Sequence, residues 1–499
     1  MASNGFDHLI FRPEKAGLWD LLGLVFSSKN LADYDFVETN CTNLPPTNFI
    51  TRVLILIFLI YSIISSSISE AANKFKAWME YSLNELNLNG GLLGLLYHTI
   101  TGSIVRPDPE AANYRSFRSF EFGKMKVRTN LMSSVKLALS LDEVDRSYHD
   151  NSVMELAALA SILAYENEAR IKDTVVNNWK MYFVEFFECW NMAINAYETE
   201  AFICCDKEED PQLIIVAFRG TSDLDDWRCD FDLSLIKMGE MGMVHLGFMT
   251  SLGLDTEKAC SGNDWNVEKG FPKEYTGSKP LAYYSIRKVL KDLVEKNKNA
   301  KILITGHSLG GALTILYTSL LVMQEEEDIL SRISWVMTFG QPRVGDAMFG
   351  DTMLKIIGTK YIRLVYRYDI VPRIPFELPF LLKFIHFGDC INYNGWYSAE
   401  KVEKLPNKNY FNILYGLIMF WGAVVDLLRA IWEITGGEWE GFTAIFLRLF
   451  WTICPGVGFH NTRDYLNSVR MATLPTNTPI KEAKAESAEI GQVRDLGGE

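Results

Sequence analysis

The stretch "KILITGHSLGGALTILYTSLLVM", which begins at Lys301, constrains the fold of this chain more than any other. It contains a short apolar run, a glycine-rich turn and a long apolar run, and Gly306, Ser308 and Gly310 match the pattern G-x-S-x-G. This pattern is typical of a sharp turn from a strand into a helix, with the serine at its tip. Side chains two positions before or after the serine would clash across such a turn, which explains the glycines. We therefore predict that Ser308 is a nucleophile held in a strained backbone conformation.

Strand and helix patterns alternate on both sides of this turn. Helices are expected over residues 152–167, 283–297, 311–324 and about 346–357, and strands over residues 301–305, 333–339 and 361–368. Two further β-rich runs, residues 196–205 and 212–219, flank a polar turn and predict a hairpin. Alternation at this spacing implies right-handed crossovers, so the expected fold is α/β with a mainly parallel central sheet.

A serine nucleophile needs a histidine base, and the base needs an acid that orients it. His307 adjoins the serine, but a sharp turn directs its side chain away from the hydroxyl. His386 lies inside a strand pattern, where a hydrogen-bonded structural role is expected. His460 follows a Gly/Pro loop and precedes a helix, an exposed position that suits a mobile base. Because the acid and then the base follow the serine in chains with this turn, we predict His460 as the base.

Three aspartates are candidates for the acid. Asp369 ends a predicted strand and starts a loop at the carboxyl edge of the sheet, where active sites of α/β proteins form. Asp346 is expected to cap the helix that follows it, and Asp389 comes after the strand pattern around His386. We therefore predict Asp369 as the acid.

A second turn, within "VAFRGTSDLDDWRCDFD", is a candidate for the oxyanion side of the same chemistry. A predicted strand ends at Gly220 and Thr221, and an acidic loop follows. Such a turn can direct a backbone N–H at the reacting oxygen and, together with the N–H of Leu309, form an oxyanion hole. A simple turn with a solvated charge run is the alternative, and the serine turn elsewhere in the chain favours the oxyanion hole.

Composition excludes several classes of partner and cofactor. The chain has 49 Lys and Arg against 62 Asp and Glu, a net charge of −13, which argues against a nucleic-acid partner. Its seven histidines lack paired spacing and its eight cysteines include no C-x-x-C, so we expect no metal and no other cofactor. The same cysteine pattern predicts no disulfide framework. With no secretory signal visible at the N-terminus, we expect a reducing compartment.

Apolar residues are concentrated in two zones. Residues 49–68 contain Arg52 as their one charge, and a helix of that length would span roughly 30 Å, about one hydrocarbon core. Together with the apolar residues 89–105, they predict a membrane-associated region over residues 49–105, either spanning or inserted. A buried core helix is the alternative reading of the apolar centre.

The second apolar zone is an insertion at residues 410–453, before the last histidine. Its two apolar stretches, residues 410–434 and 442–453, are interrupted by four charged residues: Asp426, Arg429, Glu433 and Arg448. These charges favour an amphipathic or interfacial element over a membrane span. The other predicted divisions are an N-terminal segment at 1–48, a connector at 106–148, an α/β domain at 149–475 and a disordered polar tail at 476–499.

Seven motifs occur in one order along the chain: "AFRGT", "VHLGF", "GHSLGGAL", "FGQPRVGD", "YRYDIVPRIP", "FIHFG" and "FHNTRDYL". In this order and spacing the chain resembles the class 3 lipases, an α/β-hydrolase family, over about residues 149–470. The apolar N-terminal region and the insertion look most like the plant oil-body triacylglycerol lipases of that family. The resemblance implies Ser308 as nucleophile, Asp369 as acid, His460 as base, and Thr221 and Leu309 as oxyanion donors.

The resemblance also implies an activity and a place of action. It implies a triacylglycerol lipase that works through an acyl-enzyme at a lipid-droplet or endoplasmic reticulum surface, with its catalytic domain facing the cytosol and residues 222–235 as a lid. A phospholipase or galactolipase with the same triad is one alternative. A non-catalytic lipase-like membrane protein is another, and it is disfavoured because a binding protein has no chemical need for the triad and both oxyanion positions together.

Overall fold

The computed structural model describes residues 8–472 with interruptions at 40–43, 45, 123–129, 141–150, 193, 221–233, 263–264, 376, 378–383, 396–397, 407–413, 432–441 and 453–454. Thr221, nearly all of the predicted lid at 222–235 and the predicted disordered tail at 476–499 therefore lie outside the described residues.

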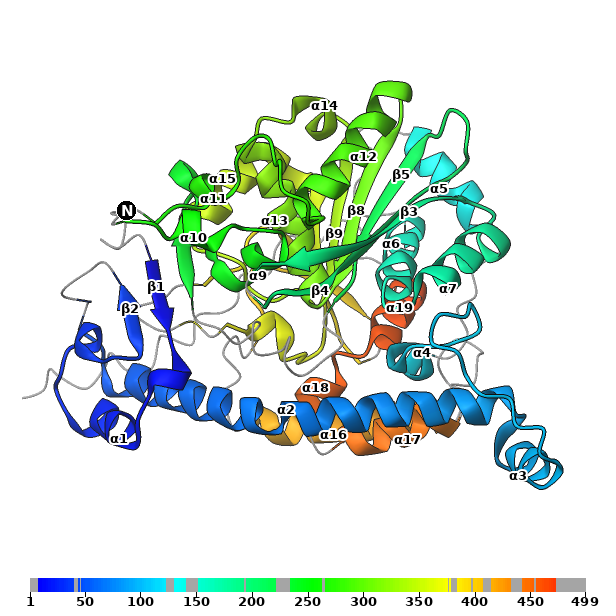
Figure 1. Ribbon diagram of the computed structural model, residues 1–499, viewed down its shortest axis with the longest axis horizontal. Coiled ribbons are helices and arrows are strands. Elements are labelled where there is room, and N and C mark those ends of the chain that lie inside the picture. Colours follow the sequence, from blue (N-terminus) through cyan, green and yellow to red (C-terminus); the bar gives the residue numbers. More distant parts are fainter. Residues whose placement is uncertain are drawn as a thin grey trace, which may run out of the picture.

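An eight-stranded sheet forms the centre of the molecule, in the order β12-β11-β10-β9-β8-β5-β4-β3 (Figure 1). Its strands are β3 (Tyr182–Asn191), β4 (Ala196–Cys205), β5 (Leu213–Phe218), β8 (Lys301–His307), β9 (Ile333–Phe339), β10 (Tyr361–Tyr366), β11 (Asp389–Tyr393) and β12 (Ala399–Val402). The neighbours from β5 through β8, β9 and β10 to β11 are parallel. β3, β4 and β12 join antiparallel. The predicted mainly parallel α/β sheet is confirmed.

The central strands lie where the sequence predicts them. β8, β9 and β10 match the expected strands, and β4 and β5 form the expected antiparallel hairpin. These strands are apolar along nearly their whole length because both faces of the sheet are covered. The strand expected around His386 is wrong in position, because this residue lies just before β11, in a segment without regular structure.

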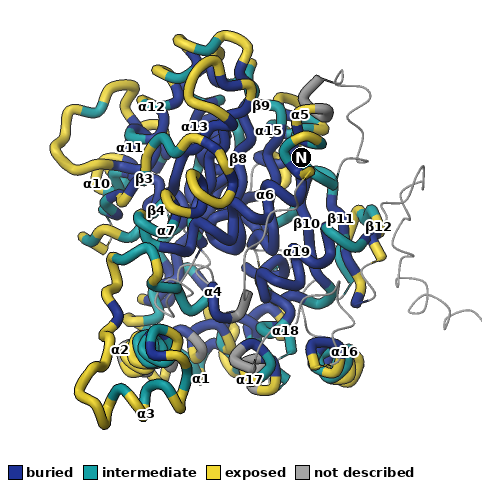
Figure 2. Tube along the Cα trace, turned by 90° about the vertical axis from the view of Figure 1, so that its right-hand side faces the viewer, coloured by how far each residue is buried: buried dark blue, intermediate teal, exposed yellow. Residues whose placement is uncertain are grey.

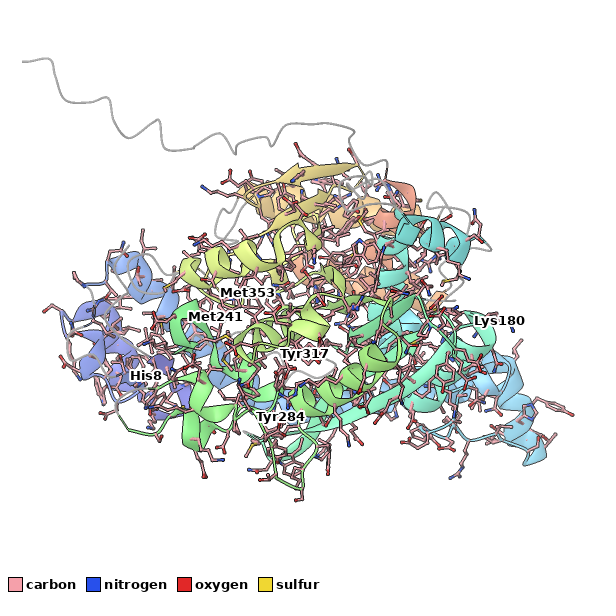
Figure 3. All side chains as sticks on the ribbon, turned by 90° about the horizontal axis from the view of Figure 1, so that it is seen from above. His8, Lys180, Met241, Tyr284, Tyr317 and Met353 are labelled. Atoms are coloured by element: carbon pink, nitrogen blue, oxygen red, sulfur yellow. The ribbon has the colours of Figure 1, made fainter. Side chains whose placement is uncertain are left out.

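Helices cover both faces of the sheet. α12 (Ala282–Lys296), α13 (Leu309–Met323) and α15 (Ala347–Ile357) pack on one face, and α5 (Leu131–Ser140), α6 (Asn151–Leu163) and α19 (Thr462–Met471) pack on the other. Figure 3 shows the side chains from above, with Tyr284 of α12 and Tyr317 of α13 labelled. Successive strand residues alternate between the two cores. Cys204 and Cys205 of β4 accordingly lie in different cores.

The N-terminal segment belongs to a second, four-stranded sheet, in the order β2-β1-β6-β7. Its strands are β1 (His8–Phe11), β2 (Val37–Thr39), β6 (Leu235–Lys237) and β7 (Met243–His245). β1 pairs antiparallel with both β2 and β6, so that His8 lies opposite Ile236. This pairing ties the start of the chain to the segment between β5 and α12.

The apolar segment at residues 49–68 is the first half of a longer helix, α2 (Phe49–Leu88). One face of this half is buried, since Leu59 and its neighbours pack in a core with β1 and α1 (Leu18–Phe26). Arg52 is buried as well and donates hydrogen bonds to three carbonyl oxygens at and just after the end of α1. For the buried face of residues 49–68, the alternative prediction of a core helix therefore holds. Within the part of the chain that the structure describes, no helix is both long and apolar enough to cross a membrane.

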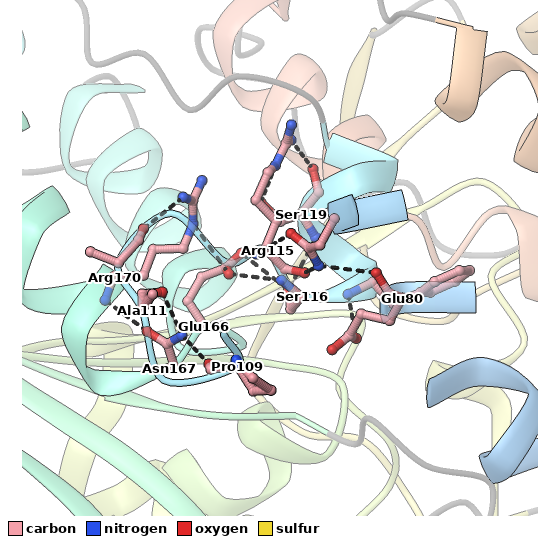
Figure 4. A network of polar contacts seen from close by, with 12 residues as sticks. Glu80, Pro109, Ala111, Arg115, Ser116, Ser119, Glu166, Asn167 and Arg170 are labelled. Atoms are coloured by element: carbon pink, nitrogen blue, oxygen red, sulfur yellow. Dashed lines mark hydrogen bonds and ion pairs between the residues drawn. The ribbon is translucent and has the colours of Figure 1, made fainter. Parts of the chain in front are cut away.

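The second half of α2 is held by polar contacts, shown in Figure 4. The Asn84 side chain accepts the N–H of Arg115 at 2.9 Å and donates to the carbonyl oxygen of the same residue at 2.8 Å. Glu80 accepts the N–H at the start of α4 (Phe117–Phe122). Glu166, after α6, accepts both the N–H and the hydroxyl of Ser116. The described part of the predicted connector therefore joins α2 to the α/β domain.

The apolar insertion forms two helices, α16 (Leu414–Ile431) and α17 (Phe442–Trp451). In both Figure 1 and Figure 2 they lie with α2 in one layer at the base of the molecule. α3 (Gly91–Thr101) follows α2 at one end of this layer. The two zones that stand out as apolar in the sequence are therefore gathered on the same side.

Candidate active site

Ser308 connects the last residue of β8 to the first residue of α13. Its φ of 59° and ψ of −131° lie in a region that residues other than glycine rarely adopt. A Cβ atom on Gly306 would lie 2.2 Å from the carbonyl oxygen of Gly310, and one on Gly310 would lie 2.3 Å from that of Phe218. This is the strained strand-to-helix turn that the glycine pattern predicts.

Gly310→Ala is expected to lower the free energy of unfolding by about 3 kcal/mol or more, because the added methyl group would overlap backbone atoms of β5. Chemical denaturation followed by circular dichroism measures the change. Gly416→Ala in α16 is the matched control, since no atom lies within 4 Å of its added Cβ atom and alanine favours a helix. Equal stability of the two variants would contradict this account of the turn.

Asp369 lies in the turn after β10 and is 0% exposed. Its Oδ1 accepts the N–H of Val371 at 2.9 Å, and its Oδ2 accepts the hydroxyl of Tyr465 at 2.6 Å. The same Oδ2 lies 2.7 Å from Nδ1 of His460. Burial, with the charge of Asp369 beside it, raises the pKa of Tyr465 well above its usual value. The tyrosine therefore stays protonated and donates to the carboxylate.

His460 lies between α18 (Pro455–Gly458) and α19. Its ring is 1% exposed, so the expectation of an exposed loop position is wrong. The ring is covered because it stacks on the ring of His307, with 4.3 Å between the centroids. When Nδ1 donates to the carboxylate of Asp369, Nε2 holds the lone pair, which is the tautomer of a general base.

The turn after β9 brings the serine and the Asp–His pair together. The N–H of Ser308 donates to the carbonyl oxygen of Phe339 at 2.9 Å. The next residue, Gly340, has a φ of 59°, and a Cβ atom there would lie 2.8 Å from Cε1 of His460 and 3.0 Å from Oδ2 of Asp369. The three residues predicted as a triad therefore gather at the carboxyl ends of the adjacent strands β8, β9 and β10.

The rival histidines have other contacts. Nδ1 of His307 shares a hydrogen bond with the hydroxyl of Tyr165 at 2.9 Å, and burial, together with the nearby His460, lowers the pKa of His307 well below its ordinary value. Nε2 of His386 bonds to the carbonyl oxygen of Pro372 at 2.6 Å, and burial lowers its pKa in the same way. Both rings therefore stay neutral, and His386 has the hydrogen-bonded position that its surroundings predict.

The rival aspartates have structural partners. Asp346 accepts the N–H of Phe349 at 2.9 Å at the start of α15, which confirms the predicted helix cap. Asp389 begins β11 and forms an ion pair with Lys401 on β12 at 2.8 Å. Across the described ranges of the chain, no group of three or more His, Cys, Asp or Glu residues is arranged to hold a metal ion.

Comparison with known proteins identifies the family. A family model described as "Lipase (class 3)" matches residues 215–378. Triacylglycerol lipase OBL1 of Nicotiana tabacum is 35% identical over 79% of this chain and 78% of that protein. Triacylglycerol lipase OBL1 of Ricinus communis is 30% identical over 93% of this chain and 94% of that protein. This chain belongs to the class 3 lipase family. Phospholipase A1-IIbeta of Arabidopsis thaliana is less similar, at 26% identity over 46% of this chain and 54% of that protein.

The structure describes only part of the oxyanion hole predicted for this class 3 lipase. Leu309 begins α13 directly after the serine, whereas Thr221 and most of residues 222–235 lie outside the described residues. Gly220, two residues after β5, packs closely against the serine turn, since a Cβ atom there would lie 2.4 Å from the carbonyl oxygen of His307. The backbone that leads into the predicted oxyanion donor is therefore beside the turn that carries the serine.

Two tyrosines that contact the site of this class 3 lipase are absent from the sequence prediction. Tyr465 on α19 donates to Asp369, and Tyr165, after α6, bonds to His307 and packs against Gly220. The motif "FHNTRDYL" places Tyr465 near the predicted base in sequence, but it does not show which way the side chain points. Tyr165 lies in the turn after α6, far from the triad residues in sequence, and nothing in the sequence connects it with the site.

Proposed function

We propose that this class 3 lipase is a triacylglycerol lipase that hydrolyses ester bonds through an acyl-enzyme on Ser308. The observation that carries the proposal is the buried pair of Asp369 and His460, 2.7 Å apart, packed on Gly340 beside the strained serine turn. A buried carboxylate and a strained serine each cost stability. Their presence together in one place supports a chemical role rather than a structural one.

In the proposed mechanism, Oγ of Ser308 attacks the ester carbonyl carbon while Nε2 of His460 takes the hydroxyl proton. Asp369 orients the imidazole and stabilises its protonated form. The backbone N–H groups of Leu309 and Thr221 bind the oxyanion of the tetrahedral intermediate. His460 then protonates the leaving alcohol, and a water molecule activated by the same histidine hydrolyses the acyl-enzyme and releases the fatty acid.

The proposed place of action is the surface of a lipid droplet (oil body) or the cytosolic face of the endoplasmic reticulum membrane. Triacylglycerols are insoluble in water, so a lipase must meet them at a surface. α2 exposes Phe75 and Trp78, and α3 exposes Leu92 and Leu93. Large exposed apolar groups gathered on one side are typical of surfaces that bind lipid or protein. They support attachment of residues 49–105 to lipid, with the long helix α2 lying along the surface.

The rival functions receive less support. A phospholipase or galactolipase would use the same triad, but the phospholipase A1 relative matches this chain at lower identity and over a smaller share of its length. A non-catalytic protein would have no use for the strained serine beside an oriented histidine.

We propose that the loop at residues 222–235 covers the site as a lid and takes part in the choice of substrate.

The test of this proposal is a lipid panel with the purified full-length protein. We expect fatty-acid release from emulsified triacylglycerol to exceed release from phosphatidylcholine or galactolipid vesicles by about tenfold or more, a difference of about 1.4 kcal/mol in transition-state binding. Titration of released acid at constant pH measures the rates, and Ser308→Ala supplies the background. Faster hydrolysis of either polar lipid would reject the assignment to triacylglycerol.

A further inference from the structure

The two helices of the apolar insertion have their charged residues on the inside. Asp426 and Arg429 of α16 and Arg448 of α17, the charged residues of these helices, are only 6%, 6% and 8% exposed. The outer face instead carries large exposed apolar side chains: Leu417, Phe420, Trp421, Leu428, Phe446 and Leu449. Helices on the surface of water-soluble proteins have the opposite arrangement. In an ordinary amphipathic helix the charged side chains would face water. In these two helices they face the protein instead.

Ion pairs on the inner face determine which way these helices point. Oδ1 of Asp426 lies 3.1 Å from Nη2 of Arg367, and Oδ2 of Asp426 accepts a hydrogen bond from the hydroxyl of Tyr366 at 3.1 Å. Arg448 forms two hydrogen bonds with the carboxylate of Asp464, at 2.8 and 2.9 Å. Separating a buried charge from its partner costs several kcal/mol, so rotating either helix to hide its apolar face is strongly unfavourable. The outward position of the apolar face is thus stabilised by the protein core.

α16 also packs on the two loops that carry the proposed acid and base. A Cβ atom on Gly422 would lie 2.6 Å from Nη1 of Arg367 and 3.3 Å from Cζ of Phe459. Arg367 lies two residues before Asp369, and Phe459 directly precedes His460. The helix whose outer side is apolar therefore supports the proposed active site with its inner side.

This apolar face lies in the same layer of the molecule as the helices proposed above to contact lipid. In the basal layer, α17 lies between α2 and α16 (Figure 2). Exposed positions follow the lower side of α2, α3 and α16 in Figure 2. Two stretches far apart in sequence, α2 with α3 and α16 with α17, therefore carry their exposed apolar groups in the same basal layer.

We propose that the outer face of α16 and α17 inserts into the acyl-chain layer of a lipid surface and so holds the active site against its substrate, an inference that rests on the proposed function. A lipid layer suits this face because it provides apolar contact without requiring hydrogen-bond or charge partners. Protein interfaces are ordinarily surrounded by a polar rim. In the described parts of these two helices, no charged side chain is exposed to contribute to such a rim.

The test compares two pairs of substitutions in the full chain. Leu417 and Trp421 on α16 are 70% and 64% exposed, and the control residues Met348 and Ile356 on α15 are both 48% exposed. We expect Leu417→Glu with Trp421→Glu to lower flotation with triolein droplets coated with phosphatidylcholine by about tenfold or more, because the two apolar side chains can no longer enter lipid. Turnover of emulsified triolein falls with it. Hydrolysis of a short-chain, water-soluble ester stays within about twofold, and Met348→Glu with Ile356→Glu changes neither measurement.

A second pair, Phe446→Gln with Leu449→Gln, tests the same face from α17 with uncharged replacements and is expected to reduce flotation in the same direction. Undiminished flotation of both outer-face pairs would overturn the proposal. A change from dimer to monomer in lipid-free solution, measured by light scattering, would also overturn it by showing that the face binds a second copy of the chain. If the unmodified protein floats through this face but hydrolyses neither ester, the docking surface stands and the proposed lipase function fails.

Discussion

Ser308→Ala is expected to lower kcat for ester hydrolysis by about 10⁶-fold, the loss seen when the nucleophile of a serine triad is removed. The change deletes the atom that would form the acyl-enzyme and leaves the turn around it intact. Oγ of Ser308 is buried and has no hydrogen-bond partner among the described residues, so its removal breaks no stabilising contact. We therefore expect the free energy of unfolding to change by less than about 1 kcal/mol.

The measurement is the initial rate on a water-soluble ester and on emulsified triolein, with flotation and thermal unfolding recorded for the same preparation. Loss of both activities with unchanged flotation and stability is the expected pattern, because binding to lipid does not use the serine. Activity within about tenfold of the unmodified protein would remove Ser308 from the mechanism.

Asp369→Asn is expected to lower kcat by about 10⁴-fold. Oδ2 of the carboxylate lies 2.7 Å from Nδ1 of His460 and holds the Nδ1 proton toward itself. The carboxylate also stabilises the positive charge that the ring acquires during catalysis. An amide at this position lacks that charge, and its NH₂ group can instead donate to Nδ1 and stabilise the wrong tautomer. The loss is expected in kcat, because the substrate makes no direct contact with the acid.

Two further variants separate this role from stability. Asp346→Asn, in the helix cap of α15, is the matched control and is expected to leave kcat unchanged, since asparagine caps helices as well as aspartate does. Tyr465→Phe removes one hydrogen-bond donor to the Asp369 carboxylate. It is expected to lower kcat by about tenfold, which corresponds to the free energy of one hydrogen bond to a charged group. If Asp369→Asn reduced kcat no more than Tyr465→Phe does, the acid would have to be sought elsewhere.

The parts of the structure that could be predicted are those where a local pattern has one structural solution. The turn around Ser308 is one, because glycines two positions before and after a serine, between an apolar strand and an apolar helix, suit very few other conformations. The helix cap at Asp346 is another, since a short acceptor before an apolar helical run bonds its own backbone. Both depend on residues within a few positions of each other.

The parts that could not be predicted depend on contacts between distant segments. The sequence shows that residues 49–68 are apolar, but whether they meet lipid or protein depends on β1 and α1, which bury one face of the helix. His460 could be chosen from the order of the residues in the chain, yet its burial results from the ring of His307 stacked against it. The register between such segments is encoded by no local periodicity.

The insertion at residues 410–453 separates most clearly what the sequence pattern predicts from what the packing of distant residues decides. Its composition, two apolar stretches with a few charges, predicts an apolar helical insertion that is amphipathic or interfacial. Which face turned inward was decided by Arg367 and Asp464, which lie on the α/β domain and bind Asp426 and Arg448. A buried charge must meet its partner, and only the folded chain brings the two together.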